Sequence, residues 1–199
     1  MVKIVQNFSP VKTLHYMLQG KLTTARMIMD ATCGQGYDCL YLTQGMDESA
    51  ELVAFDIQQA ALELTRTLLE EHGLADRVRL YNDSFVNFER YINQPLDLVV
   101  FNLGYLPGTN KKITTGVADL QSTLPRLLNM LNLNGVIGIV SYRGHSEGLT
   151  EYLWLQDYLS QLNNKIYNVG RYELFNHTKA APVVYIIERI KEWSVYERS

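Results

Sequence analysis

The chain of 199 residues is 47% hydrophobic and 20% charged, with a formal net charge of −3. That charge excludes a global attraction to nucleic acid, which would need a local basic patch, and no apolar stretch approaches the ~20 residues of a membrane span. No signal-peptide core stands at the start of the chain. The two cysteines, Cys33 and Cys39, are not joined by a second cysteine pair or a histidine cluster that would indicate a metal site. We therefore expect a cytoplasmic protein with one domain, residues 1–199, in which residues 1–25 are an N-terminal helical cover.

Apolar periodicity predicts alternating helices and strands along the chain. Helices are expected at 11–18, 37–44, 58–72, 117–131 and 149–162. Strands are expected at 26–31, 51–56, 77–81, 96–101, 136–141, 165–175 and 183–190. The fourth strand is mostly apolar, which is typical of a central strand buried on both faces. The last two strands have no helix-length gap between them. The pattern therefore predicts an α/β fold with a seven-stranded, mostly parallel sheet, a C-terminal antiparallel hairpin, and helices on both faces.

The first strand leads into a glycine turn. Residues 29–38 are Met-Asp-Ala-Thr-Cys-Gly-Gln-Gly-Tyr-Asp, which predicts a strand ending at Asp30, a tight turn and a helix. Such a turn lets backbone N–H groups approach a ligand at a helix N-terminus. Asp56 follows Gly36 by twenty residues, at the tip of the second strand, where a carboxylate can accept hydrogen bonds from a ribose. A Gly-x-Gly alone is often a plain turn, but together with Asp30 and Asp56 it favours a nucleoside-containing cofactor.

The residues around the turn distinguish between cofactors. Asp38 would put a negative charge beside the phosphates of a dinucleotide, and the chain has no Gly-Lys-Ser or Gly-Lys-Thr for a nucleoside triphosphate. Acidic side chains suit a cofactor that has cationic groups and no phosphate. S-adenosylmethionine has a sulfonium and an amino group, so it is the expected cofactor.

Polar residues follow the predicted strands at the edge where open α/β sheets bind their ligands. They are Asp30, Asp56, Asp83 with Ser84, Asn102, and Ser141 with Tyr142. Solvation explains any one of these positions, but five in order favour a binding edge. Over nearly the whole chain, the order of strands and helices resembles that of the Rossmann-like class I methyltransferases.

The loop after the fourth strand begins Asn-Leu-Gly-Tyr-Leu-Pro-Gly, residues 102–108. It resembles the Asn-Pro-Pro-Tyr motif of amino-methylating class I enzymes, in which the asparagine and loop carbonyls hold the target nitrogen and the aromatic ring stacks on the base. The chain keeps Asn102 and Tyr105 but has Leu103 and Gly104 in place of the prolines, so a specificity for adenine or glutamine does not follow. A turn aromatic that caps the core is the other interpretation of Tyr105.

A longer set of motifs strongly resembles the YtqB family, whose members were first described as rRNA methylases. The motifs lie at residues 30–38, 54–58, 101–108, 113–115 and 142–148, and the match runs from about residue 8 to residue 190. The resemblance implies methylation of the aminomethyl group of the wobble uridine in tRNA, 5-aminomethyl-2-thiouridine (the MnmM activity). The implied partner is therefore the anticodon region of tRNA.

The patterns and the resemblance together give candidate roles to individual residues. Those expected to orient the amine, contact the base or relay a proton are Asn102, Tyr105, Tyr142 and His145. Those expected at the cofactor are Asp30, Gly34, Gln35, Gly36, Tyr37, Asp38, Asp56, Gln58, Asp83, Ser84 and Phe85. Those expected at the RNA are Gly104, Lys111, Lys112, Arg143, His177 and Lys179. His145 and His177 have a structural hydrogen bond as their other interpretation, and the basic residues are also typical of a solvated face. His15 and His72 are expected at the surface or in packing.

Other functions stay open at this point. The same fold and cofactor could serve an rRNA base or a small-molecule amine, or the chain could be a non-catalytic cofactor-binding or scaffold protein; a dehydrogenase is a more distant alternative. The C-terminal part is rich in tyrosine, at Tyr152, Tyr158, Tyr167, Tyr172 and Tyr185. These side chains could form core, an RNA-stacking surface or a homodimer surface, and core is expected for most of them.

Overall fold

The computed structural model describes residues 9–104, 116–177 and 181–192. Its α-helices are α1 (Pro10–Leu22), α2 (Tyr37–Gly45), α3 (Gln59–Glu71), α4 (Val117–Met130) and α5 (Ser146–Ser160). Its strands are β1 (Met27–Asp30), β2 (Glu51–Phe55), β3 (Val78–Tyr81), β4 (Leu96–Leu103), β5 (Leu131–Ser141), β6 (Tyr167–Tyr172) and β7 (Val183–Arg189). Two short 3-10 helices, η1 (Ala75–Arg77) and η2 (Phe85–Arg90), flank β3.

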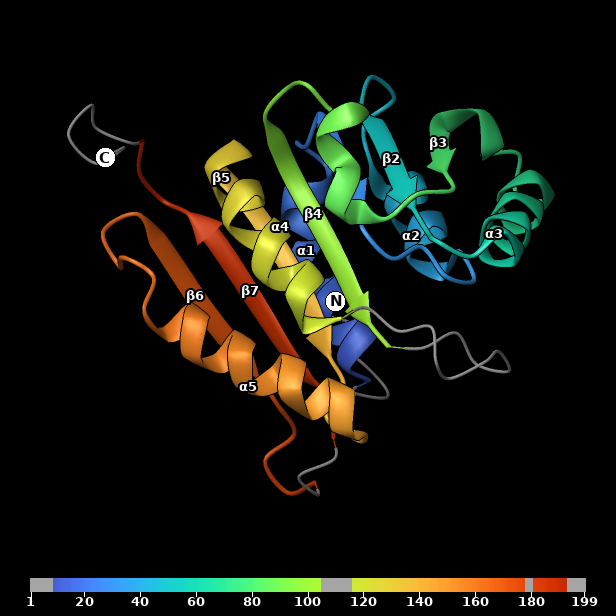
Figure 1. Ribbon diagram of the computed structural model, residues 1–199. Coiled ribbons are helices and arrows are strands. Elements are labelled where there is room, and N and C mark those ends of the chain that lie inside the picture. The colour runs from blue at the N-terminus through green and yellow to red at the C-terminus, as the bar shows by residue number, and fades with distance from the viewer. Residues whose placement is uncertain (1–8, 105–115, 178–180, 193–199) are drawn as a thin grey trace, which may run out of the picture.

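One seven-stranded sheet runs through the molecule in the order β3-β2-β1-β4-β5-β7-β6 (Figure 1). The first five strands pair in parallel, and β7 is antiparallel to both β5 and β6. The predicted mostly parallel sheet with a C-terminal antiparallel hairpin is therefore confirmed, and β4 is central as expected. Because parallel strands end at the same edge, the segments that follow β1, β2, β4 and β5 lie near one another.

Some element boundaries differ from the predicted ones for local reasons. Helix α1 begins earlier than expected because the Ser9 hydroxyl accepts a hydrogen bond from the Lys12 backbone N–H at 3.2 Å and Pro10 occupies the first turn. Strand β5 begins directly after α4, five residues before the predicted start. Leu133 and Asn134 are exposed there, and Asn134 has a φ of 60°, so the apolar pattern does not reveal the first part of the strand.

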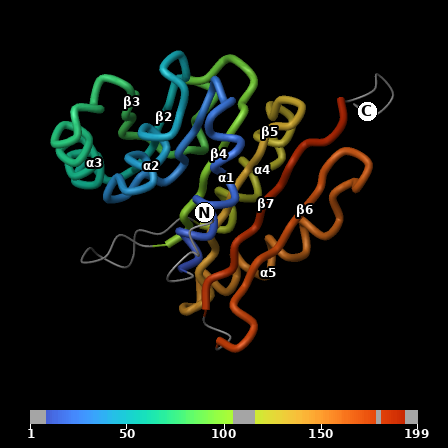
Figure 2. The backbone as a smooth tube through the Cα atoms, turned by 180° about the vertical axis from the view of Figure 1, so that it is seen from behind, coloured from blue at the N-terminus to red at the C-terminus, as the bar shows by residue number. Residues whose placement is uncertain are grey.

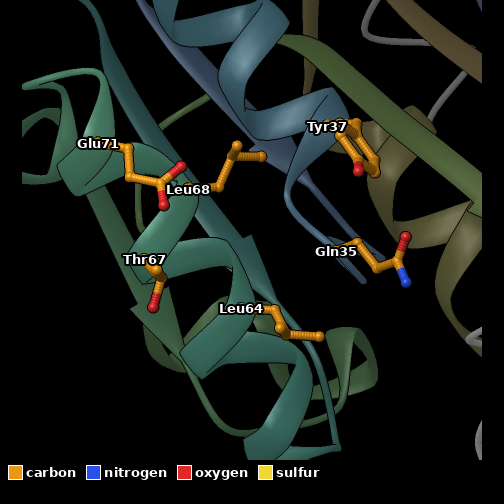
Figure 3. A pocket seen from close by; sticks show the side chains of 6 residues that line it. All are labelled: Gln35, Tyr37, Leu64, Thr67, Leu68 and Glu71. Atoms are coloured by element: carbon orange, nitrogen blue, oxygen red, sulfur yellow. The ribbon is translucent and has the colours of Figure 1, made fainter.

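Helices cover both faces of the sheet, as predicted. Helices α4 and α5 lie on the face toward the viewer in Figure 1, and α1, α2 and α3 lie on the opposite face, which Figure 2 shows from behind. A shallow pocket of about 240 Å³ lies beside the turn before α2 and the neighbouring face of α3, and the residues that line it are Gln35, Tyr37, Leu64, Thr67, Leu68 and Glu71 (Figure 3). Within the described ranges, no helix is long and apolar enough to cross a membrane.

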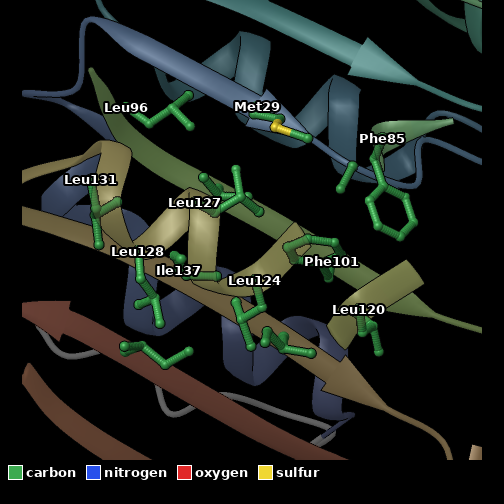
Figure 4. Close-up of a cluster of buried hydrophobic side chains, with 14 of the residues drawn as sticks. Met29, Phe85, Leu96, Phe101, Leu120, Leu124, Leu127, Leu128, Leu131 and Ile137 are labelled. Atoms are coloured by element: carbon green, nitrogen blue, oxygen red, sulfur yellow. The ribbon is translucent and has the colours of Figure 1, made fainter. Parts of the chain in front are cut away.

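The hydrophobic core has two halves because side chains of a strand alternate between the faces of a sheet. In β4, Leu98 and Val100 pack toward α1, whereas Val99 and Phe101 pack toward α4. Helix α4 meets the sheet with leucines at helical spacing, Leu120, Leu124, Leu127 and Leu128 (Figure 4). The expectation of core positions is confirmed for three tyrosines that are almost fully buried, Tyr152, Tyr167 and Tyr185.

Helix α1 is held against the sheet at a glycine. Leu14, Leu18 and Leu22 are each only 1% exposed. A Cβ atom built on Gly138 in β5 would lie 2.5 Å from a methyl carbon of Leu14, which is closer than non-bonded carbon atoms approach. The missing side chain at position 138 therefore lets α1 pack directly on β5.

We predict that Gly138→Ala lowers the free energy of unfolding by about 1–3 kcal/mol, since overpacking a filled core costs this much. Gly20→Ala is the matched control, because nothing lies within 4 Å of a Cβ at that helical position. The control should be neutral or stabilising by roughly 0.5–1 kcal/mol, because alanine is the better helix former. Urea unfolding measures both variants, and an unchanged stability of Gly138→Ala would contradict this packing.

Candidate active site at the strand ends

The glycine turn between β1 and α2 forms the centre of the site. Gly34 and Gly36 have φ values of 52° and 86°, a backbone conformation that favours glycine. A Cβ on Gly36 would lie 2.8 Å from the Cα of Thr65 in α3, and the Thr65 hydroxyl donates to the Gly34 carbonyl at 3.1 Å. The turn is therefore pressed against α3. It also has room only for a residue without a side chain at position 36, and it directs the N-terminus of α2 toward the edge of the sheet.

Asp56 connects the second strand tip to this turn. One carboxylate oxygen accepts from the Gly34 N–H at 3.0 Å, and the other accepts from the Gln58 N–H at 2.9 Å, at the start of α3. Burial raises the pKa of Asp56, although these backbone hydrogen bonds act in the opposite direction. The carboxylate is thus fixed beside the turn, in the position expected of a group that accepts hydrogen bonds from a ribose.

Two further carboxylates, those of Asp30 and Asp38, flank the turn in the sequence and interact electrostatically. Asp30 has no exposed surface, and its carboxylate accepts from the Thr32 N–H at 3.1 Å and from the Cys39 thiol at 3.2 Å. Burial and, second, the nearby charge of Asp38 raise the pKa of Asp30 to about 7. Asp30 therefore supports the turn from inside, and its role toward a cofactor stays a prediction.

Asp38 lies in the first turn of α2 and links two distant parts of the chain. One of its oxygens is 2.6 Å from Nε2 of His15, and the other accepts from Nδ2 of Asn102 at 3.1 Å. The backbone N–H of Asn102 donates in turn to the Thr32 hydroxyl at 2.8 Å. The end of β4 is thereby fixed to the segment after β1 through both the backbone and the side chain of Asn102.

Tyr142 completes the described part of this edge from the end of β5. A Cβ on Gly104 would lie 3.5 Å from its ring, so the ends of β4 and β5 are in contact. Burial and, to a smaller degree, the charge of Asp38 raise the pKa of the Tyr142 hydroxyl. Asp30, Asn102 and Tyr142, all predicted at the site, are thus brought together around the carboxylate of Asp38. Asp56 contacts the glycine turn separately, at Gly34.

The three residues expected near an adenine also make contacts within the protein. Asp83 accepts from the Ser84 N–H and the Asn87 amide, each at 2.7 Å, and the hydrogen bond from Asn87 is the main reason that the pKa of Asp83 is lowered. The Ser84 hydroxyl caps η2. Phe85 is 6% exposed and packs edge-on against Phe101 at 5.3 Å between ring centroids. Their side chains stabilise η2, and a role at the cofactor stays a prediction.

Of the six residues expected at the RNA, the structure describes Gly104, Arg143 and His177. Arg143 donates to the Ala181 carbonyl at 2.8 Å and to Glu173 at 3.0 Å, and its guanidinium lies over the ring of Tyr152, so its charge is already engaged within the protein. His145 is the N-cap of α5, where Nδ1 accepts from the Gly148 N–H at 3.1 Å, as in its structural interpretation. His177 is exposed. Tyr105, Lys111, Lys112 and Lys179 lie outside the described residues.

Three residues that shape this site are absent from the roles predicted from the sequence. Thr32 and Thr65 fix the turn through their hydroxyl groups, and His15, which was expected at the surface or in packing, contacts Asp38. Thr32 lies inside the glycine motif, so its position was a usable signal. Nothing local to His15 indicates its partner, because the two residues are 23 positions apart and meet only through packing of α1.

Known proteins that resemble this chain match most of its length. A family model described as "Putative rRNA methylase" matches residues 52–188. A protein of Arabidopsis thaliana named "tRNA (mnm(5)s(2)U34)-methyltransferase, chloroplastic" is 30% identical over 185 residues, which cover 88% of this chain and 68% of that protein. These matches confirm the resemblance found in the motifs.

Solved structures show the same architecture. A "putative rRNA-methylase" from Clostridium thermocellum is 30% identical, with a TM-score of 0.88 over 94% of this chain and 100% of that chain. A "putative methyltransferase" from Streptococcus mutans, solved in complex with S-adenosylhomocysteine, is 26% identical, with a TM-score of 0.81 over 95% of this chain and 99% of that chain. The predicted class I methyltransferase fold is confirmed by both.

We predict that Asp56→Ala weakens binding of S-adenosylhomocysteine at least about tenfold, roughly 1.4 kcal/mol, because a ribose would lose a charged hydrogen-bond acceptor. Isothermal titration calorimetry measures the dissociation constant. Asp76→Ala, at an exposed position in η1, is the control and should bind as the wild type does. Equal affinities for the two variants would remove Asp56 from the cofactor site.

Proposed function

Because the chain belongs to the family described as "Putative rRNA methylase", it is an S-adenosylmethionine-dependent methyltransferase, and we propose that its substrate is the wobble uridine of tRNA. The proposed reaction methylates the aminomethyl group of 5-aminomethyl-2-thiouridine to give 5-methylaminomethyl-2-thiouridine. The name of the Arabidopsis relative, a tRNA methyltransferase for mnm5s2U34, supports this choice.

The residues at the strand ends suit this cofactor. The turn at Gly34 and Gly36 leaves backbone N–H groups at the start of α2 free of side-chain caps, and a carboxylate is stabilised at such a helix N-terminus. Asp56 would accept from the ribose hydroxyls, with Gln58 beside it. Gln35, Tyr37 and Asp38 would contact the methionine part of the cofactor. Asp30 would interact with the amino group of that part through water. Residues 83–85 would flank the adenine. Bound S-adenosylmethionine would supply an electrophilic methyl group on its sulfonium.

The orientation of Asn102 is the observation that carries the proposed amine chemistry. An ionised carboxylate only accepts hydrogen bonds, so the side-chain NH2 of Asn102 must face Asp38. Within the described residues no donor contacts the amide oxygen of Asn102, which is then left as an acceptor. A primary amine has N–H groups to donate to such an oxygen, and a methyl-accepting nitrogen must be held in line at roughly 3–3.5 Å from the methyl group. Asn102, with Tyr105 from the following loop, would orient the nitrogen.

The site must also keep the amine neutral, because its lone pair forms the new N–C bond as the C–S bond breaks. With lysine as a guide, an alkylamine has a pKa near ~10 in water. A desolvated surrounding lowers that value, and Tyr142 is half-buried at this edge. The methylated amine then loses a proton to water or to a nearby acceptor. Tyr142 and His145 are the candidates to contact the base or to relay this proton.

The family relationship supports tRNA as the substrate more strongly than any basic surface does. Arg143 is engaged with Glu173, and the lysines proposed to contact phosphates lie outside the described residues. The proposed binding mode is an unpaired base that enters at the strand-end edge, where Gly104 and His177 would contact the RNA. An rRNA base is the second candidate substrate, because the family description names rRNA.

The test is mass spectrometry of nucleosides from tRNA of cells that lack this gene, before and after incubation with the purified protein and S-adenosylmethionine. We expect the aminomethyl uridine to accumulate in the cells and to gain one methyl group in the tube. If neither occurs while ribosomal RNA or a small amine is methylated, the tRNA assignment is wrong and the methyltransferase assignment stands.

Asn102→Ala separates catalysis from cofactor binding. We expect its kcat to fall at least 100-fold, because the amine loses its orienting acceptor, with an unchanged dissociation constant for S-adenosylhomocysteine. Asn168→Ala, on the exposed side of β6, is the control and should retain full activity. Wild-type turnover by Asn102→Ala would contradict the proposed role of this residue.

A further inference from the structure

His15 occupies an unexpected position for a residue of the N-terminal helix. Its Nε2 atom is 2.6 Å from one carboxylate oxygen of Asp38, and both side chains are largely shielded from solvent, at 17% and 7% exposure. The other oxygen of Asp38 holds the Asn102 amide at 3.1 Å. The three side chains therefore form one continuous chain of hydrogen bonds that runs from α1 to the end of β4.

The imidazole is held in place from several directions. Its ring stacks on Tyr41 of α2, with 3.8 Å between centroids and 1° between the planes. The Tyr41 hydroxyl donates to the backbone carbonyl of His15 at 2.5 Å. The preceding residue, Leu14, fits over Gly138 of the central sheet. A ring fixed this firmly presents one nitrogen to Asp38 with little freedom to turn away.

The hydrogen-bond inventory determines which atom faces which. Because the Asp38 carboxylate is an acceptor, Nε2 of His15 must carry a hydrogen when it contacts Asp38, as the Asn102 amide nitrogen must. Each oxygen of Asp38 thus has its own donor, and the carboxylate cannot rotate without losing both hydrogen bonds. The fixed carboxylate in turn fixes the side-chain amide of Asn102, whose oxygen is left for a ligand.

We propose that His15 is a positioning residue for methyl transfer: through Asp38, it holds the Asn102 amide with its oxygen toward the acceptor nitrogen. This inference rests on the proposed function, because it assigns His15 to the same reaction. Without the imidazole donor, one oxygen of Asp38 is left without its hydrogen bond near the buried Asp30. Asp38 then turns toward other donors, and Asn102 loses its orientation.

The alternative is that His15 only fastens α1 to α2. Two substitutions distinguish the roles. His15→Phe keeps an aromatic ring against Tyr41 but removes the donor, whereas His15→Gln keeps an N–H donor at a length similar to that of Nε2. A fastening role is served by the ring, and a positioning role is served by the donor, so the two variants should behave in opposite ways under the two accounts.

The experiment measures kcat and KM with undermodified tRNA, the dissociation constant for S-adenosylhomocysteine, and the melting temperature. For His15→Phe we expect kcat to fall at least about tenfold, because a hydrogen bond to a charged group is lost, with KM for tRNA within about twofold of wild type and a loss of cofactor affinity smaller than the loss in kcat. His15→Gln should recover most of the loss. His72→Phe, the same change at the exposed histidine that caps the C-terminus of α3, should behave as wild type. In an Asn102→Ala background, His15→Phe should cause no further loss.

A second measurement does not depend on the substrate. In wild-type protein, the side-chain NH2 protons of Asn102 should be protected from hydrogen exchange in NMR spectra, and His15→Phe should remove that protection while His15→Gln retains it. If wild-type protein methylates no tRNA but this pattern holds, the proposed substrate fails and the positioning role of His15 stands. Full activity and unchanged protection in His15→Phe would overturn the inference.

Discussion

The left-handed backbone at Gly36 is the constraint on which the arrangement of the site depends. Its φ of 86° turns the chain from the end of β1 directly into α2, and the close approach of Thr65 leaves no space for a side chain there. Asp38 consequently falls in the first turn of α2, facing the end of β4. From that position one carboxylate reaches His15 on one side and Asn102 on the other.

Negative charge gathered under this turn shapes the chemistry of the edge. Burial and, second, the nearby charge of Asp38 make ionisation of Asp30 costly, so the pKa of Asp30 rises to about 7. Hydrogen bonds from Thr32 and Cys39 compensate for part of that cost at Asp30, and those from His15 and Asn102 stabilise the carboxylate of Asp38. An edge of this kind favours a cofactor with cationic groups, such as a sulfonium and its amino group, over ligands that carry phosphates.

Much of the fold follows from local sequence patterns. The apolar strands, the glycine turn and the polar residues at the strand ends were sufficient to predict the sheet and to bring Asp30, Asp38, Asp56 and Asn102 together, because parallel strands end at one edge. The side-chain partners were harder to predict. Asp83 accepts hydrogen bonds from residues in and beside η2, a 3-10 helix that has no strong periodic signal.

His15 illustrates the same limit from the other direction. Its contact with Asp38 depends on where α1 packs, and that position is decided by the space above Gly138, more than a hundred residues away. Arg143 is similar, since its partner Glu173 belongs to the segment after β6. Such contacts depend on tertiary packing, whereas sequence motifs predict only local structure.

The most direct measurement is a crystal structure of the protein with S-adenosylhomocysteine and an anticodon stem-loop that carries 5-aminomethyl-2-thiouridine. The account predicts that the amine nitrogen lies within hydrogen-bond distance, ~3 Å, of the Asn102 side-chain oxygen, on the side of the sulfur that the methyl group would occupy, while the Asn102 side-chain nitrogen stays on Asp38. An amine bound away from Asn102, or an Asn102 amide turned with its nitrogen toward the ligand, would contradict it.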